Sequence, residues 1–276
     1  MNASLRDALE MVGLTDTGRM RDHNEDAISF DADLGVAILA DGMGGYNAGE
    51  VASGIAVEEV ARSLRDAIAG TPLHAEEAGT VWPQAHRILR DAVEMANLVV
   101  HATSLRDARF SGMGTTLVAG IFYDNRVLLA HVGDSRCYRW RGGKFEQLTR
   151  DHSLVQEQID AGLLAPEEAQ ASEYKNLVTR AIGVEAGVLV ELQEYPAQAD
   201  DLFLFCSDGL SDMLGAATIA EILSDNTQGL MSVACALIEQ ANEAGGLDNI
   251  SVLLVRIRRD FRVNRGLLQR LAGWLK

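Results

Sequence analysis

Five short clusters of polar residues carry most of the chemistry that this sequence could perform. Each cluster places Asp or Glu at the end of an apolar stretch, beside Gly, Ser or Asn. The clusters are Asn24-Glu25-Asp26, Asp41-Gly42, Gly133-Asp134-Ser135-Arg136, the stretch from Ser207-Asp208 to Asp212, and Asp248-Asn249. One Asp in such a place is an ordinary turn residue. If the apolar stretches are neighbouring strands, however, their ends converge, and so many ionised carboxylates repel one another unless cations neutralise them.

The type of ligand selects the metal. Carboxylate and backbone carbonyl oxygens suit Mg²⁺ or Mn²⁺. No Cys and no paired His accompanies the clusters, which argues against zinc, and we expect surface or core roles for most of the six histidines. Residues 31–35 (DADLG) lack the remaining ligands of an EF-hand loop, and the DGMGG stretch at 41–45 lacks the Lys and Ser/Thr of a P-loop.

A pair of such divalent ions would allow phosphate chemistry. Two divalent ions about 3.5–4 Å apart can share a water, lower its pKa and present hydroxide to a phosphorus atom. A fixed cation is then needed for the phosphoryl oxygens. Arg21, four residues before Glu25, could supply it, because a guanidinium binds two phosphate oxygens in a fork. The alternative for Arg21 is a surface ion pair with a nearby Asp. The residue types therefore indicate metal-assisted hydrolysis of a phosphate ester.

Short apolar runs bounded by Gly, Asp or Asn predict the strands that position the clusters. These strands are expected at 11–14, 27–30, 36–40, 116–122, 127–132, 137–140, 202–206 and 250–257. Turn pairs at Asp124-Asn125 and Gly142-Gly143 predict an antiparallel meander over 116–148. Apolar residues at helical spacing predict helices at 48–69, 82–104, 218–223 and 230–243. This order favours a single α+β domain with sheets inside and helices outside.

Composition excludes several other classes of protein. With 276 residues, 47% of them hydrophobic, the chain can bury a large core. No apolar run approaches the roughly 18–20 residues of a membrane span, and the first residues lack the features of a signal peptide, so we expect a cytoplasmic protein. Residues 1–255 carry a net charge of −22. An acidic body of this size repels nucleic acid, so we expect no nucleic-acid partner.

Two segments stand apart from the series of strands. Residues 149–181 are polar, include a helix-like stretch at 153–161, and are expected to form a surface insertion beside the site. Residues 258–276 are basic and end in LLQRLAGWLK, which has one apolar face. This tail could lie on an anionic membrane or in a partner's groove. We favour packing onto the chain's own acidic body, because residues 256–276 have a net charge of +6.

Six motifs carry a specific resemblance, in sequence order. They are RDHNED at 21–26, DGMGG at 41–45, GMGTT at 112–116, VGDSR at 132–136, SDGLSD at 207–212 and DNIS at 248–251. Over residues 10 to 257 the chain resembles the metal-dependent protein phosphatases of the protein phosphatase 2C (PPM) family, and most of all its bacterial branch. The resemblance implies a four-layer α-β-β-α sandwich, with two mostly antiparallel sheets flanked by pairs of helices. It also implies a phosphatase domain at 1–257, followed by the tail at 258–276.

The family pattern assigns a role to each acidic cluster. It implies that two Mn²⁺ or Mg²⁺ ions are held by Asp41, which bridges them, by the carbonyl of Gly42, and by Asp208 and Asp248. Glu25 and Asp26 would act mainly through metal-bound waters. Asp134 and Asp212 would form a third site of lower affinity.

The same pattern assigns the remaining parts of the site. Arg21 would hold the substrate phosphate, and 149–181 would be a mobile flap beside the cleft. One position departs from the pattern, because Met43 stands where animal members have a His that is proposed as general acid. We therefore assign no general acid.

The leading hypothesis is hydrolysis of phosphoserine and phosphothreonine in proteins, opposing a bacterial Ser/Thr kinase. Its implied partners are phosphorylated proteins, including that kinase, and a membrane contact could come only from the tail. One alternative is a phosphatase for a single regulator, such as an anti-sigma-factor antagonist. The other is a metal-binding pseudophosphatase that serves as an interaction module. The pseudophosphatase is disfavoured because every metal-ligand position of the family pattern is filled.

Overall fold

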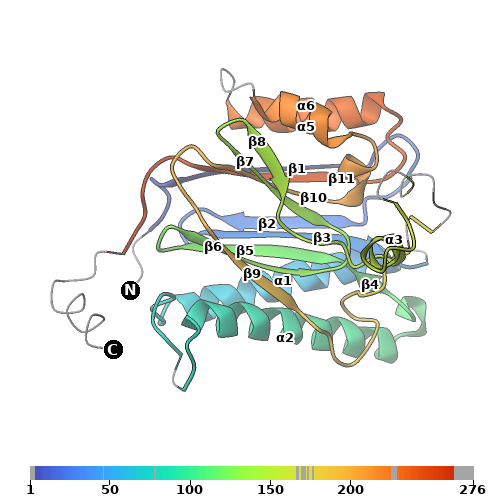
Figure 1. The fold of residues 1–276 in the computed structure, drawn as a ribbon. Helices are drawn as coiled ribbons and strands as arrows, with labels where there is room; N and C mark the ends of the chain where they lie inside the picture. Colours follow the sequence, from blue (N-terminus) through green and yellow to red (C-terminus); the bar gives the residue numbers. More distant parts are fainter. Residues whose placement is uncertain are drawn as a thin grey trace.

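Two β-sheets lie face to face in the computed structural model, and helices cover both outer faces (Figure 1). The structure describes residues 4–45, 47–77, 79–165, 168, 172, 174–175, 177–224 and 229–263. Every pair of neighbouring strands in both sheets is antiparallel. The predicted four-layer sandwich is therefore confirmed.

The first sheet joins strands from both ends of the chain. Its order is β1 (Leu9–Asp16), β11 (Ile250–Ile257), β10 (Leu202–Cys206), β7 (Arg136–Arg141) and β8 (Lys144–Gln147). Helices α5 (Ala216–Ser224) and α6 (Leu230–Glu243) cover its outer face. Leu204, Leu237 and Leu254 are fully buried between this sheet and these helices.

The second sheet is built from the first half of the chain plus one later strand. Its order is β2 (Asp26–Asp31), β3 (Val36–Met43), β5 (Leu117–Tyr123), β6 (Arg126–Val132) and β9 (Glu191–Pro196), with β4 (Gly114–Thr115) paired to the end of β3. The long helices α1 (Ala48–Ile68) and α2 (Gln84–Arg106) cover it. The described residues also form the short helices η1 (Ala108–Phe110), α3 (Leu154–Asp160) and α4 (Asp208–Ser211).

Strands at the centre of the sandwich are buried on both faces. In β3, Ile38 packs toward α1 and α2, whereas Leu39 packs toward the other sheet. Successive side chains of a strand point to opposite faces, so a strand between two layers reads as one continuous apolar run. Phe122 and Phe203 meet edge to face across the inter-sheet layer, with ring centroids 5.3 Å apart.

The structure contains all the predicted strands and helices, but it corrects their arrangement. The meander predicted over 116–148 is wrong, because β5 and β6 form a hairpin in one sheet and β7 and β8 form a hairpin in the other. The chain crosses between the sheets at Gly133, whose φ is 105°. A Cβ there would lie 2.7 Å from the side chain of Thr116, so the crossing requires glycine. Apolar alternation indicates which side chains are buried, and it carries no information on which sheet a strand joins.

The two segments that stand apart in the sequence are described in part. Residues 149–181 contain the predicted helix, α3, and their two ends are joined by a hydrogen bond from Thr179 N–H to His152 O. The bonds from His152 N–H to Gly133 O and, directly after the segment, from Ile182 N–H to Thr115 O connect these ends to the rest of the fold. In the tail, residues 258–263 are described, and the predicted apolar face at 267–275 lies outside the described residues. Within the described part of the chain, no helix combines the length and apolar character needed to cross a membrane.

Candidate active site

The acidic clusters of the sequence come together at one end of the sandwich, where strands of both sheets begin or end. Asp26 opens β2 and lies directly opposite Asp41 of β3 in the antiparallel register. Asp208 follows β10 and Asp248 precedes β11, so these two come from the other sheet. Burial and the charges of Asp26 and Asp208 raise the pKa of Asp41. The carboxylates of the two sheets therefore repel one another, and a bound cation would relieve this repulsion.

Asp26 is buried, and only one of its two carboxylate oxygens has a hydrogen-bond partner. Its Oδ2 accepts a 2.8 Å hydrogen bond from the hydroxyl of Ser207. Its Oδ1 is buried without a hydrogen-bond partner. Burial, which is the largest cause, and the nearby charges of Asp208 and Asp248 raise the pKa of Asp26 to about 7. A buried carboxylate oxygen without a donor is a position that a cation can fill.

The neighbouring carboxyl groups show the same electrostatic pattern. Burial raises the pKa of Asp208 to about 6 and that of Asp134 to about 7, and each is raised further by other acidic groups of the cluster. Burial also raises the pKa of Asp41 well above its usual range, with added repulsion from Asp26 and Asp208. Asp208 Oδ1, like Asp26 Oδ1, is buried without a partner. These groups could together hold divalent cations through oxygen ligands.

Close backbone packing fixes Glu25 and Gly42 next to the start of α1. Gly42 N–H donates to Glu25 O over 3.0 Å. A Cβ on Gly42 would lie 2.1 Å from Gly49 O, and one on Gly49 would lie 2.5 Å from Glu25 Oε1. Glycine is therefore required at Gly42, whose contact is with backbone. The carboxylate of Glu25 lies close to Gly49 in the first turn of α1, where the helix dipole favours an anion.

Asn249 organises the loop that carries Arg21 and Glu25. Its Oδ1 accepts the N–H of Glu25 over 2.8 Å, and its Nδ2 donates to Thr17 O and His23 O, each over 2.9 Å. The sequence shows Asn249 in one of the acidic clusters but does not indicate this role. A short polar residue immediately before a buried strand is equally typical of an ordinary turn.

Arg21 lies at the rim of the acidic cluster. Its half-exposed guanidinium contacts Asp248 Oδ2 over 2.7 Å, and this contact is the main cause that raises its pKa. The ion pair with a nearby Asp, which the sequence left open as an alternative, is therefore present. Its partner, however, belongs to the acidic cluster itself, so the guanidinium lies where an anion bound at the cluster would meet it.

Asp134 and Asp212 both interact electrostatically with Asp208. After burial, the charge of Asp208 is the next cause that raises the pKa of Asp134, and the charge of Asp212 contributes to the raised pKa of Asp208. Asp134 is buried, whereas Asp212 is more exposed, follows α4, and forms a 3.0 Å ion pair with Lys175. Lys175 belongs to the 149–181 insertion. The structure thus brings this insertion against the acidic site through Asp212.

A cluster of His131, His152 and Glu191 also lies near this end of the sandwich, and the sequence did not reveal it. Their potential ligand atoms lie within 4.8 Å of one another. His152 Nδ1 accepts the N–H of Gly133 over 3.1 Å, so its proton is on Nε2, which faces Glu191 Oε2 at 3.2 Å. A protonated nitrogen cannot bind a metal, and Arg180 lies 3.3 Å from the same atom.

These groups therefore form a hydrogen-bond network rather than a cation site. His131 adds to it by donating from Nε2 to Arg150 O over 2.8 Å, and the N–H of His152 donates to Gly133 O over 2.9 Å. The network fastens the first residues of the insertion to the crossing at Gly133, directly before Asp134. The expected core role of these two histidines agrees with these contacts.

Comparison with known proteins gives consistent matches over most of the chain. The family model for protein phosphatase 2C matches residues 18–250. The serine/threonine phosphatase stp of Listeria monocytogenes is 43% identical over 248 residues, which cover 87% of this chain and 93% of that protein. The crystal structure of the Mycobacterium tuberculosis serine/threonine phosphatase PstP/Ppp superposes with a TM-score of 0.81 at 36% identity, covering 91% of this chain and all of that one. A structure of the PstP catalytic domain with two manganese ions gives a TM-score of 0.78 at 36% identity, covering 91% of this chain and 99% of that one.

Proposed function

Because this chain belongs to the protein phosphatase 2C family and is a metal-dependent protein serine/threonine phosphatase, we propose that it hydrolyses phosphoserine and phosphothreonine with water at a centre of two divalent ions. The observation that carries the metal centre is the pair of orphaned oxygens, Asp26 Oδ1 and Asp208 Oδ1, which are buried without hydrogen-bond partners. Oxygen ligands alone suit Mn²⁺ or Mg²⁺. The two manganese ions in the PstP catalytic domain support the same number here.

Each acidic residue then has a role toward the ions. We propose that Asp41, the carbonyl of Gly42, Asp208 and Asp248 would hold the ions directly, and that Glu25 and Asp26 would act through metal-bound water. When bound, the ions supply a water of lowered pKa and neutralise negative charge on the phosphate. Asn249 supports this arrangement, since its side chain holds the backbone of Glu25 against the start of β11.

Arg21 orients the substrate phosphate. Its guanidinium lies beside Asp248 and is half-exposed, so it can reach an incoming phosphate group without displacing the core. A guanidinium can bind two phosphate oxygens at once and fix the orientation of the ester. The proton for the departing Ser or Thr oxygen has no assigned donor, since Met43 cannot supply one.

Phosphorylated proteins are the proposed substrates, and a bacterial Ser/Thr kinase is the proposed partner whose action this enzyme reverses. A phosphothreonine peptide and an aryl phosphate, each assayed with EDTA, Mg²⁺ and Mn²⁺, test this function. We expect hydrolysis of both with either metal and none in EDTA. No turnover with any metal would instead favour a pseudophosphatase, and turnover of a single phosphorylated regulator alone would favour a dedicated phosphatase.

Metal binding should depend on pH, because protons compete for the same carboxylates. The pKa of Asp208 is about 6 and that of Asp26 about 7 in the metal-free protein, both raised above their unfolded values. A raised acid pKa means that the folded state holds its proton more tightly than the unfolded chain. The stability that these bound protons give to the metal-free fold is therefore lost as pH rises through about 4 to 7. We expect the increase in melting temperature caused by Mn²⁺, relative to EDTA, to be large at about pH 8 and to shrink toward about pH 5.5. An increase that is constant over this range would contradict ligation by these carboxylates.

We further infer a third, weaker cation site at Asp134 and Asp212, supported by the electrostatic repulsion between each of them and Asp208. Asp212→Ala is expected to lower kcat by about 10-fold while it spares the central pair. Titration calorimetry with Mn²⁺ should show a weak binding event that is lost in Asp212→Ala and kept in Lys175→Gln, because Lys175 occupies Asp212 as a competing cation. If the wild-type titration shows only two binding events, Asp212 binds no cation and serves only to end the short helix α4.

A further inference from the structure

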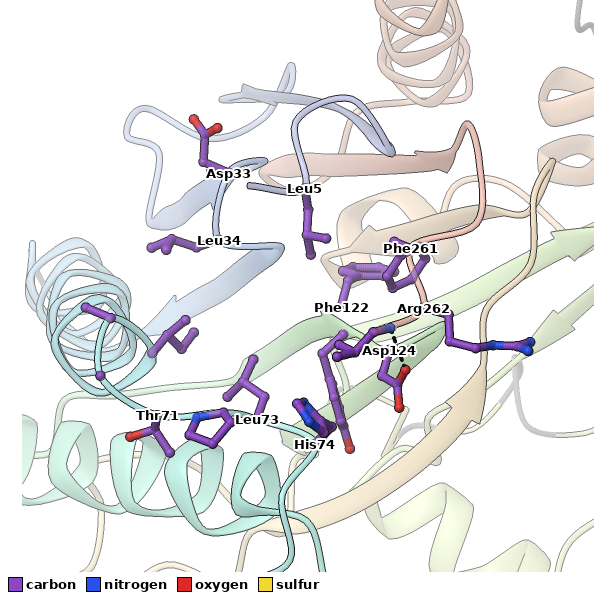
Figure 2. A pocket seen from close by; sticks show the side chains of 16 residues that line it. Leu5, Asp33, Leu34, Thr71, Leu73, His74, Phe122, Asp124, Phe261 and Arg262 are labelled. Carbon is purple, nitrogen blue, oxygen red and sulfur yellow. Dashed lines mark hydrogen bonds between the residues drawn. The ribbon is translucent and has the colours of Figure 1, made fainter. Parts of the chain in front are cut away.

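A groove of about 770 Å³ lies between the start of β3, the end of α1 and the β5–β6 turn (Figure 2). Apolar side chains from segments far apart in the sequence line much of it: Leu5, Leu34, Leu73, Phe122 and Phe261. Strand β3 runs from its start at Val36 to Asp41 in the acidic cluster, a span of about 17 Å at the usual rise per residue. The groove is therefore separate from the site at which phosphate would bind.

The described part of the basic tail follows the surface toward this groove. After β11, Arg258 N–H donates to Ala8 O over 2.7 Å. Arg258 and Arg259 then form ion pairs with Glu10 and Asp7, at 3.1 Å and 3.0 Å. The opposite charges of the tail and the body, which the sequence indicated, thus meet directly in the residues that the structure describes.

The tail then enters the groove itself. Phe261 is 8% exposed and packs with Leu5 and Phe122 in the inter-sheet core. Its N–H donates to Asn125 Oδ1 over 2.7 Å, and the N–H of Val263 donates to Asp124 Oδ1 over 2.8 Å. The turn of the β5–β6 hairpin therefore holds the tail at the groove, and Val263 forms part of the lining.

We propose that residues 264–276 pack into this groove and cover its apolar lining. They follow Val263 without a gap, and they bring five large apolar side chains: Leu267, Leu268, Leu271, Trp274 and Leu275. Thirteen residues reach about 20 Å as a helix and about 43 Å when extended, so the segment can span the groove in either form. Residues 1–3, Met-Asn-Ala, precede the lining residue Leu5 and offer a single large apolar side chain, so they are the weaker candidate.

Charge favours the same occupant. The segment also carries Arg265, Arg270 and Lys276 and has no acidic residue, whereas residues 1–255 have a net charge of −22. Burial of the leucines then supplies the driving force, and the arginines can remain at the edge of the groove, where Asp33 and Asp124 lie. The tail is thus a stabilising part of the fold, and it acts at a distance from the phosphatase chemistry.

The test compares the full chain with a chain that ends at Val263 and with Leu267→Asp/Leu271→Asp. Both variants are expected to lower the melting temperature by about 4 °C or more, to speed hydrogen exchange at residues 68–74 and 122–126, and to change kcat/KM less than about twofold. Asn264→Asp/Gln269→Asp is the matched control, since it adds the same two charges to polar positions of the segment. It is expected to match the wild type in all three measurements.

A second pair of variants tests the groove rather than the segment. A Cβ on Gly70, which lines the groove, meets nothing within 4 Å, and the same is true of Gly187 outside it. Gly70→Trp in the full chain should displace the segment and speed exchange at 122–126, whereas Gly187→Trp should not.

Two further outcomes would overturn the proposal. One is a chain ending at Val263 whose melting temperature and hydrogen exchange equal those of the full chain. This result overturns the proposal even if the deletion also abolishes binding to anionic phosphatidylserine vesicles. The other is a loss of stability without faster exchange at the groove, since the segment would then pack elsewhere.

Discussion

Replacing Asp41, Asp208 or Asp248 by Asn is expected to lower kcat/KM for a phosphothreonine peptide by about 10³-fold or more. Asn keeps the size and one oxygen of each side chain but removes the charge that a divalent ion requires. The three residues come from β3, the end of β10 and the start of β11, so no single strand carries the site. Steady-state kinetics with saturating Mn²⁺ measures the effect.

A second measurement separates loss of the site from loss of the fold. In metal-free protein burial raises the pKa of Asp41 and Asp208, and repulsion among the carboxyl groups adds to this effect. Removing one charge should therefore leave the melting temperature in EDTA equal to that of the wild type or higher. The increase in melting temperature with Mn²⁺ should fall at the same time.

Asp66→Asn provides the control for this series, because Asp66 is an exposed residue of α1 whose described contact is a surface ion pair with Arg62. It should match the wild type in activity and in both melting temperatures. Near-normal turnover in any of the three site variants, with or without chelator, would refute the assignment of that residue to the metal centre.

Replacing Arg21 by Ala is expected to lower kcat/KM by about 10²-fold, through a higher KM and a lower kcat together. The guanidinium binds the phosphate oxygens in the ground state, and these oxygens carry more charge in the transition state. Arg21→Lys should recover part of the loss, since an ammonium lacks the fork. The ratio of the two variants therefore reports on two-point binding rather than on charge alone.

Arg21→Ala also removes the ion pair with Asp248, so its effect on stability needs a control. Arg6→Ala is suitable, because Arg6 forms a similar exposed pair with Asp33, 2.7 Å apart, on a different part of the surface. Each substitution is expected to change the free energy of unfolding by about 1 kcal/mol or less, as exposed ion pairs do. If Arg21→Ala leaves kcat/KM unchanged, Arg21 does not bind the substrate phosphate and forms only a surface ion pair.

The sequence determined the local parts of this protein. Strand periodicity, the turn at Asp124-Asn125 and the apolar stripes of α1 and α2 depend on neighbouring residues, and all are present. Both turn residues have positive φ, 44° and 58°, as the hairpin requires. The acidic clusters at strand ends were also visible, because a run of apolar residues followed by Asp is a local pattern. The polar edge strand β9 (Glu191–Pro196) was missed, since an edge strand with intermediate burial has no such pattern.

Tertiary structure alone decided how the clusters are joined. Asn249 bonds Glu25 across 224 positions of the chain, and Ser207 bonds Asp26 across 181. The contact of Lys175 with Asp212 and the network of His131, His152 and Glu191 likewise join separate segments. Hydrogen bonds and ion pairs of this kind act over about 3 Å, so they exist only after the two sheets have packed and brought their strand ends together. No periodicity along the chain encodes that distance, which is why the acidic clusters could be recognised in the sequence while the residues that hold them in place could not.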